Sequence, residues 1–145
     1  MMVISKSMAE APRAKEAELQ RLVAMALDET GLLWFHPANE RKCTAITGRL
    51  LKLAGVKRGV PDCLIMEPFM AQGQKFIGMA VELKASRNKL TDDQKKWKFK
   101  LEARGWQFSV CMTLAEVLEK LMQFYPDTAG YSTAEDCYRV TKRRC

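Results

Sequence analysis

The sequence predicts an α/β fold in which a mixed central β-sheet is flanked by helices. Segments with helical spacing of apolar residues alternate along the chain with short apolar runs bounded by turn residues. Of the 145 residues, 48% are hydrophobic and 28% are charged, which is typical of a globular domain with a buried core. We expect one such domain over residues 14–125, between an N-terminal arm (residues 1–13) and a C-terminal extension (residues 126–145).

Two helices and a short strand are predicted in the first part of this domain. A helix is predicted over residues 14–30, because the apolar residues of this segment fall on one stripe. Gly31 is expected to end it. The stripe consists of Leu19, Leu22, Val23, Ala26 and Leu27. The apolar run 32–35 predicts a first strand. A second helix is expected over about residues 43–53, with Gly55 as its C-terminal signal.

Three further strands follow from apolar runs. Residues 63–66 predict a buried strand, and residues 76–83 predict another after a hairpin connection at 68–74. Residues 106–112 predict the last core strand. The two strands around the hairpin are therefore expected to be antiparallel neighbours.

Capping residues indicate where the last two helices begin. Thr91 is expected to be an N-cap with Gln94 as its capping-box partner, and this helix runs to about Arg104. Thr113 is expected to cap a final helix, which Pro126 ends. The inward-facing residues predicted for that helix are Leu114, Val117, Leu118, Leu121 and Met122.

The charge and the cysteines narrow the class of protein. A formal net charge of +7 favours a polyanionic partner, most commonly nucleic acid. The five cysteines show no C-x-x-C spacing and only one histidine is present, so we expect no zinc site and reduced thiols. Neither a secretory signal nor a membrane-spanning run is expected. We therefore expect a cytoplasmic protein. The compact format of the chain suggests a phage or bacterial genome.

Two carboxylates are expected to meet at one edge of the sheet. Asp62 stands at the start of the strand 63–66, and Glu82 stands at the polar end of the strand 76–83. Antiparallel strands joined by a hairpin place these two positions side by side. Paired carboxylates repel each other unless a hard cation such as Mg²⁺ binds both. The backbone carbonyl of Leu83 is a further candidate ligand.

Lys84 adds a positive charge to the same group. It follows Glu82 by two residues, so both side chains lie on the same face of a strand. An ammonium group there orients a water molecule and stabilises charge that develops on a phosphate. Either the Glu-x-Lys pair or the Pro61-Asp62 turn alone is commonplace. Their combination, with Pro-Asp leading one strand and Glu-x-Lys ending the next, predicts a divalent-metal nuclease.

The flanking residues carry a family resemblance. The runs 55–62 (Gly-Val-Lys-Arg-Gly-Val-Pro-Asp), 81–84 (Val-Glu-Leu-Lys) and 89–94 (Lys-Leu-Thr-Asp-Asp-Gln) occur in this order. Together they resemble the virus-type replication-repair nuclease (VRR-NUC) domain, over residues 14–124. This domain belongs to the PD-(D/E)-x-K superfamily, so the resemblance implies a restriction-endonuclease-like core and a metal-dependent DNA endonuclease.

The resemblance also implies roles for individual residues. Asp62 and Glu82 would be ligands of Mg²⁺, for which Mn²⁺ substitutes, and the carbonyl of Leu83 would join them. Lys84 would be the base that orients water. Gln94 would face the site from the start of its helix, in addition to its expected part in the capping box.

The family further places a glutamate of the first helix at the site, and two candidates stand here. Glu16 lies three residues before Leu19 and seven before Val23, so it shares the core-facing stripe. Glu18 points to the flank of the helix, and we therefore favour Glu16. Gln20 lies on the neighbouring edge, where it could assist the site, but it is interpreted as a solvated residue of the helix flank.

Several basic residues are candidates for contact with phosphates. Lys57 and Arg58 are the strongest, because their loop leads directly into Asp62. Further candidates are Arg41, Arg49 and Lys89. Gly59 is expected to let the chain turn close to the substrate.

Four ring-bearing residues have commoner structural interpretations than functional ones. His36, the only histidine, is interpreted as a loop residue hydrogen-bonded to backbone. Trp97, Phe99 and Trp106 are interpreted as core or interface residues rather than as platforms for nucleic acid bases. None of the four is predicted to take part in catalysis.

The first functional hypothesis is a homodimer that cuts four-way DNA junctions. Stand-alone VRR-NUC domains resemble archaeal Holliday-junction resolvases, and a two-fold dimer matches the symmetry of a junction. A nuclease acting on flaps, nicks or forks would use the same chemistry and is the enzymatic alternative. A basic DNA-binding module without catalysis is the third hypothesis, and the intact Asp62, Glu82 and Lys84 argue against it.

Overall fold

The computed structural model describes residues 12–37, 43–86 and 89–128. The helices among these residues are α1 (Pro12–Thr30), α2 (Ala45–Leu53), α3 (Asp92–Glu102), α4 (Leu114–Phe124) and the short 3₁₀ helix η1 (Pro126–Thr128). The strands are β1 (Trp34–Phe35), β2 (Cys63–Ile65), β3 (Phe69–Ala71), β4 (Gln74–Phe76), β5 (Gly78–Leu83) and β6 (Trp106–Cys111). Most of the expected N-terminal arm and C-terminal extension lies outside the described residues.

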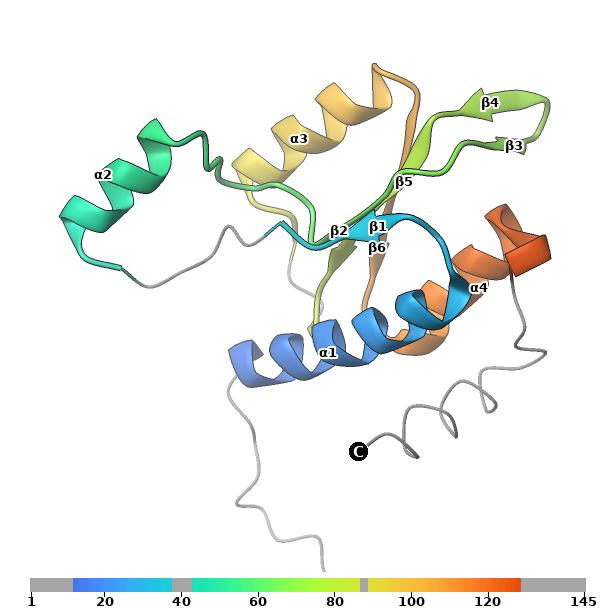
Figure 1. Cartoon of the computed structure of the whole chain (residues 1–145), viewed down its shortest axis with the longest axis horizontal. Coiled ribbons are helices and arrows are strands. Elements are labelled where there is room, and N and C mark those ends of the chain that lie inside the picture. Colours follow the sequence, from blue (N-terminus) through green and yellow to red (C-terminus); the bar gives the residue numbers. More distant parts are fainter. Residues whose placement is uncertain (1–11, 38–42, 87–88, 129–145) are drawn as a thin grey trace, which may run out of the picture.

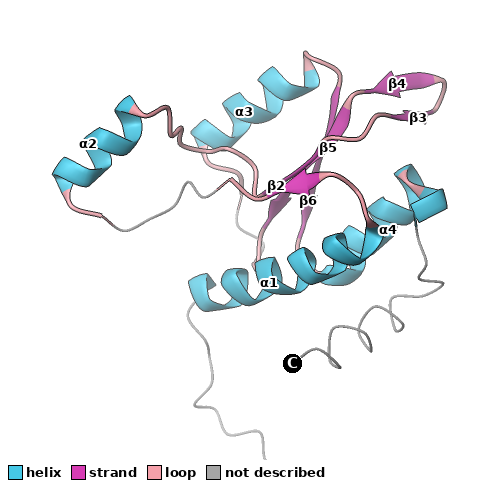
Figure 2. Cartoon of the chain, in the orientation of Figure 1, coloured by secondary structure: helices cyan, strands magenta, loops and turns pink. Residues whose placement is uncertain are grey.

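The central sheet is mixed, as the sequence predicted. Its strand order is β1-β2-β5-β6, and β3 pairs with β4 in a separate hairpin (Figure 2). The β1–β2 and β2–β5 pairs are antiparallel, whereas β5 and β6 are parallel and are connected through α3. The predicted α/β fold with a helix-flanked mixed sheet is therefore confirmed.

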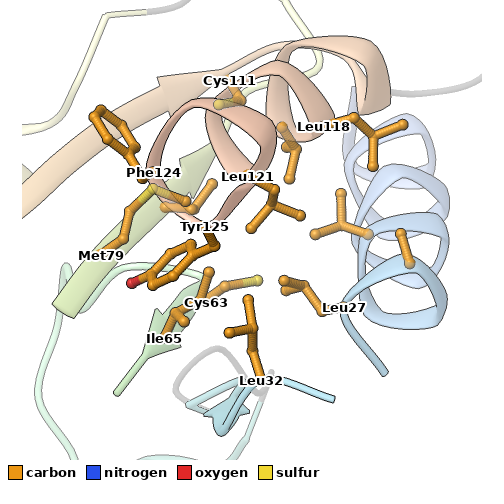
Figure 3. Close-up of a cluster of buried hydrophobic side chains, with 14 of the residues drawn as sticks. Leu27, Leu32, Cys63, Ile65, Met79, Cys111, Leu118, Leu121, Phe124 and Tyr125 are labelled. Atoms are coloured by element: carbon orange, nitrogen blue, oxygen red, sulfur yellow. The ribbon is translucent and has the colours of Figure 1, made fainter. Parts of the chain in front are cut away.

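The helices cover the two faces of the sheet unequally. Helices α1 and α4 lie together on one side of the sheet, and α3 lies on the other (Figure 1). The α1 and α4 side holds the larger core, in which Leu27, Ile65 and Leu121 pack with further buried side chains (Figure 3). A smaller cluster on the α3 side is built on Leu101 and Phe108. Strand alternation sends neighbouring residues of β5 into these two different environments.

Capping hydrogen bonds fix where α3 and α4 begin. The Thr91 side chain accepts a hydrogen bond from the backbone N–H of Gln94, and the Gln94 side chain accepts one from the backbone N–H of Thr91. This is the predicted capping box. Thr113 accepts a hydrogen bond from the N–H of Glu116 at the start of α4, so that predicted N-cap is confirmed as well.

Some predicted boundaries, and one residue predicted to face inward, were wrong. Helix α1 already includes Pro12, whose fixed φ suits the first turn of a helix. The predicted strand 76–83 begins only at Gly78, because Gln74–Phe76 forms β4 in the hairpin with β3. Met122, predicted to face inward, is 37% exposed because it follows the buried Leu121 and points away from the core.

Helix α2 differs from α1, α3 and α4 because it contributes no buried side chain. Its large apolar residues Ile46, Leu50 and Leu53 are exposed among the described residues. No helix within the described ranges is long and apolar enough to cross a membrane. The cysteines that the structure describes, Cys43, Cys63 and Cys111, are free thiols.

Candidate active site

Asp62 and Glu82 stand beside each other at one edge of the sheet. In the antiparallel β2–β5 pair, Cys63 lies opposite Val81. One residue further along this register, Asp62 lies opposite Glu82. The backbone N–H of Leu83 donates a hydrogen bond of 2.7 Å to Oδ2 of Asp62. The Asp62 carboxylate is thereby fixed against the Glu82–Leu83 segment of the neighbouring strand.

Glu82 is a buried carboxylate with two polar partners on its Oε1 atom. Its exposed fraction is only 3%. Nε2 of Gln94 donates a hydrogen bond of 2.6 Å to it, and Nζ of Lys84 lies 3.7 Å away. A charged group removed from water requires such partners. The amide of Gln94 and the ammonium group of Lys84 thus help to hold Glu82 in its orientation.

Gln94 joins the start of α3 to the sheet edge. Its Oε1 accepts a hydrogen bond of 2.8 Å from the backbone N–H of Thr91, while its Nε2 reaches Glu82. One side-chain amide therefore closes the capping box and orients a site carboxylate. The sequence offered two interpretations of Gln94, as a capping-box partner and as a residue facing the carboxylates, and its hydrogen bonds fit both.

His36 and Cys63 are further groups next to Asp62. Nδ1 of His36 donates a hydrogen bond to the backbone carbonyl of Asp62, since a carbonyl oxygen only accepts. The predicted loop histidine bonded to backbone is therefore confirmed. Burial, together with the negative charges of Asp62 and Glu82, raises the pKa of the Cys63 thiol to about 12, against the lowering effect of a hydrogen bond from Gln20. Cys63 accordingly stays protonated near neutral pH and is no nucleophile.

The oxygen donors at this edge fit a hard divalent cation. Asp62 and Glu82 supply carboxylates, and Leu83 supplies a backbone carbonyl. In the part of the chain that the structure describes, no group of three or more His, Cys, Asp or Glu side chains is gathered to hold a metal ion. Mg²⁺ typically takes one or two carboxylates and retains several waters. A pair of carboxylates with a carbonyl is consistent with that preference.

The two glutamate candidates of α1 differ in their surroundings. Glu18 is exposed and pairs with Arg21 at 2.7 Å, and this hydrogen bond lowers the pKa of Glu18. Glu16 is half-buried, one turn before Gln20. It does not join Asp62 and Glu82 in a group of three among the described residues. The structure thus half-buries Glu16 but does not gather it with the carboxylate pair into a metal-holding group.

The basic candidates lie on different elements. Lys57 and Arg58 are exposed on the loop that leads into Asp62, Arg49 is exposed on α2, and Lys89 is exposed before α3. The fifth candidate, Arg41, lies outside the described residues.

Gly59 turns the chain, as expected, and the structure gives a further reason for a glycine at this position. Its φ is +77°, a conformation that favours glycine. A Cβ atom on Gly59 would lie 2.5 Å from the carbonyl carbon of Asp93 and 2.7 Å from the backbone nitrogen of Gln94. The close approach that requires a glycine is therefore made to the first turn of α3.

Three residues have surroundings that the sequence did not predict. Gln20 is half-buried and donates a 3.5 Å hydrogen bond to Sγ of Cys63, so its interpretation as a solvated residue was wrong. Nε1 of Trp97 donates a 2.9 Å hydrogen bond to the backbone carbonyl of Arg58. Oγ of Ser86 is buried without a hydrogen-bond partner among the described residues. For Trp97, the one signal in the sequence was its spacing of three residues from Gln94, which places both on the same face of a predicted helix.

Comparisons with known proteins point to one family and to its fold. The family model described as the VRR-NUC domain matches residues 6–113. Among solved structures, a chain described as a VRR_NUC domain protein aligns with a TM-score of 0.58 and 22% sequence identity, over 77% of this chain and 88% of that chain. At this identity the likeness shows the fold alone. No curated protein matches the chain.

Proposed function

This chain belongs to the VRR-NUC family, which implies a nuclease of the PD-(D/E)-x-K type, and from that premise we propose that it is a metal-dependent DNA endonuclease. The observation that carries the proposal is the 2.7 Å hydrogen bond from Leu83 to Asp62. It sets the Asp62 carboxylate beside Glu82 at an edge that also holds Lys84. Two acids and one ammonium group at a single edge suit hydrolysis of a phosphodiester.

The metal ligands proposed are the carboxylates of Asp62 and Glu82 and the carbonyl of Leu83. We propose Mg²⁺ as the ion, with Mn²⁺ as a substitute. When bound, such an ion lowers the pKa of water and polarises a phosphate. Gln94 contributes by holding Oε1 of Glu82 in one orientation, so that the ligand is preorganised before the ion arrives.

The remaining roles are assigned to groups that hold a proton or a charge. Lys84 orients the attacking water through its ammonium group and stabilises the negative charge that develops on the phosphate. Lys57 and Arg58 hold the DNA backbone, because their exposed loop leads into Asp62. Glu16 is proposed to assist from α1, outside the set of metal ligands, and the substitution Glu16→Gln measures that assistance.

We propose that the substrate is a four-way DNA junction and that the acting species is a homodimer. The described part of each copy carries one carboxylate pair, so two symmetric cuts in a junction require two copies. The cations proposed to bind DNA contact phosphates rather than bases, which favours recognition of DNA shape over sequence. A nuclease for flaps or forks would share every residue named here and is distinguished by its substrate.

The test is cleavage of end-labelled four-way junction, flap and linear duplex DNA with Mg²⁺ or Mn²⁺, together with the mass of the protein in solution. We expect paired symmetric cuts in the junction, a dimer mass, and no cutting by Asp62→Asn. Preference for the flap by a monomer would replace the junction proposal with the flap nuclease. Absence of cutting on all three substrates with either ion would overturn the nuclease assignment.

A further inference from the structure

The loop that carries Lys57 and Arg58 is attached to the first turns of α3. Nε1 of Trp97 donates its 2.9 Å hydrogen bond to the carbonyl of Arg58. The next residue, Gly59, lies so close to the backbone of Asp93 that no side chain fits between them. These are two independent contacts on consecutive residues of the loop. They fix the backbone from which the two cationic side chains extend.

Trp97 is itself anchored in the protein. Its partly buried ring packs against the small cluster of Ala80, Leu101 and Phe108 on the α3 face of the sheet. Its N–H reaches outside that cluster, where it donates to the carbonyl of Arg58. The indole therefore connects the core of this face to the loop.

The same part of α3 is also connected to the carboxylate pair, directly to Glu82 and through the loop to Asp62. Gln94 lies three residues before Trp97, so the two side chains share one face of the helix. Gln94 holds Glu82, and Trp97 holds the loop that ends at Asp62. The relative position of the cations and the carboxylates is thus set from one stretch of helix.

We propose that Trp97 is a positioning residue that places Lys57 and Arg58 at a fixed distance from Asp62 and Glu82, so that a bound DNA backbone meets the carboxylates in register. This inference rests on the proposed nuclease function. It assigns Trp97 an indirect role, because the indole acts on DNA through the loop. Its hydrogen bond accordingly contributes to DNA affinity only while the two cations are present.

The experiment is a double-mutant cycle on DNA binding. Affinity for a four-way junction is measured with Ca²⁺ in place of Mg²⁺, for Trp97→Phe, for Lys57→Ala/Arg58→Ala, and for the combination of both. Phenylalanine keeps an apolar ring in the cluster and deletes the N–H. We expect Trp97→Phe to weaken binding roughly two- to tenfold, the size of one neutral hydrogen bond. In the background without the two cations, the same change has no effect on affinity.

A matched control removes an equivalent N–H elsewhere. Nε1 of Trp34 donates a 2.9 Å hydrogen bond to Asp28, and its ring packs against the larger core on the opposite face. Trp34→Phe is expected to leave DNA affinity and cleavage unchanged. Thermal unfolding of every variant shows whether a loss of binding comes from a loss of folded protein.

A second variant disturbs the same attachment from the loop. Gly59→Ala introduces a Cβ atom where α3 leaves no space, so the loop must move away. It is expected to reproduce the loss caused by Trp97→Phe, again only when Lys57 and Arg58 are present. This variant keeps the inference testable if Trp97→Phe fails to fold.

The outcomes separate this inference from the function on which it rests. A wild-type protein that cuts DNA, with Trp97→Phe and Gly59→Ala binding as tightly as wild type, overturns the inference alone. Equal losses with and without the two cations overturn it as well, because they indicate a general structural effect. A wild-type protein that cuts no DNA overturns the proposed function, whereas the binding cycle still reports on Trp97.

Discussion

The two faces of the central sheet use the same strands for different purposes. On the face covered by α1 and α4, β5 contributes Val81 and Leu83 to an apolar core. On the face covered by α3, the intervening Glu82 is buried beside Gln94, and the apolar cluster there is small. Strand alternation produces this separation. We therefore expect stability to come mainly from one face, and the proposed chemistry to take place on the other.

The largest effect is expected on the polar face. Lys84→Ala removes the ammonium group beside Glu82 and should reduce the rate of DNA cleavage by about a hundred- to a thousandfold, as the loss of a charge-stabilising group does in other enzymes. Cleavage is measured in single turnover with Mg²⁺. The matched control is Lys98→Ala, because Lys98 pairs with Glu102 near the far end of α3. Comparable losses in both variants would mean that charge in general, rather than this site, is responsible.

The largest effect on the apolar face should appear in stability. Leu27 is fully buried in the larger core, so Leu27→Ala is expected to lower the free energy of unfolding by about 2–5 kcal/mol. Urea unfolding followed by circular dichroism measures this change. The half-buried Leu22, on the same helix, should cost less when replaced by alanine. In Leu27→Ala, the cleavage rate per folded molecule should equal that of wild type. A lower rate per folded molecule would contradict the separation of stability and chemistry between the two faces.

Gln94 tests whether one residue serves both structure and chemistry. Gln94→Ala is expected to reduce cleavage by roughly ten- to a hundredfold, as loss of a group that orients a metal ligand typically does. It also removes one capping hydrogen bond, at a cost of about 1 kcal/mol. Cleavage kinetics and thermal unfolding measure the two effects separately.

Gln94→Glu separates the two roles of this side chain. Glutamate is equally suited to a capping box, but it sets a second carboxylate against Glu82. We expect the helix start to be retained and cleavage to be lost. A fully active Gln94→Glu protein would show that the contact with Glu82 has no part in the reaction.

The smallest effect is expected at the end of the sheet remote from the site. The hydroxyl of Tyr125 donates a 2.8 Å hydrogen bond to the carbonyl of Glu67, and Tyr125→Phe should cost about 1 kcal/mol. Burial raises the pKa of Tyr125, so the stability provided by its neutral phenol is present below its ordinary pKa of 10 and is lost as the pH rises above that value. Unfolding measured at pH 8 and pH 10.5 should show a smaller pH effect in Tyr125→Phe than in wild type.

Local rules were sufficient to predict most of the fold. The caps at Thr91 and Thr113 depend on residues a few positions away, and both were found from the sequence. The hairpin argument likewise depends only on strand order, and it set Asp62 beside Glu82. These features could be predicted because each depends on neighbours along the chain or on one antiparallel pair.

Contacts between distant segments could not be predicted. Strands β3 and β4 belong to a cluster in which the ring of Phe69 packs against Phe76, Phe124 and Tyr125, and the sequence gives no sign of the contact with α4. The hydrogen bond from Trp97 to Arg58 joins residues 39 positions apart. Such pairs depend on how helices dock on the sheet, which composition and periodicity leave undetermined.

The most direct test of the account compares wild type with Asp62→Asn for cleavage of four-way junction DNA at saturating Mg²⁺. Asparagine retains an oxygen that accepts the hydrogen bond from Leu83, so the fold is preserved while the ligand charge is lost. We predict cleavage by wild type, none by Asp62→Asn, and the same unfolding temperature for both. Undiminished cleavage by Asp62→Asn would contradict the assignment of the site to the edge where Asp62 meets Glu82.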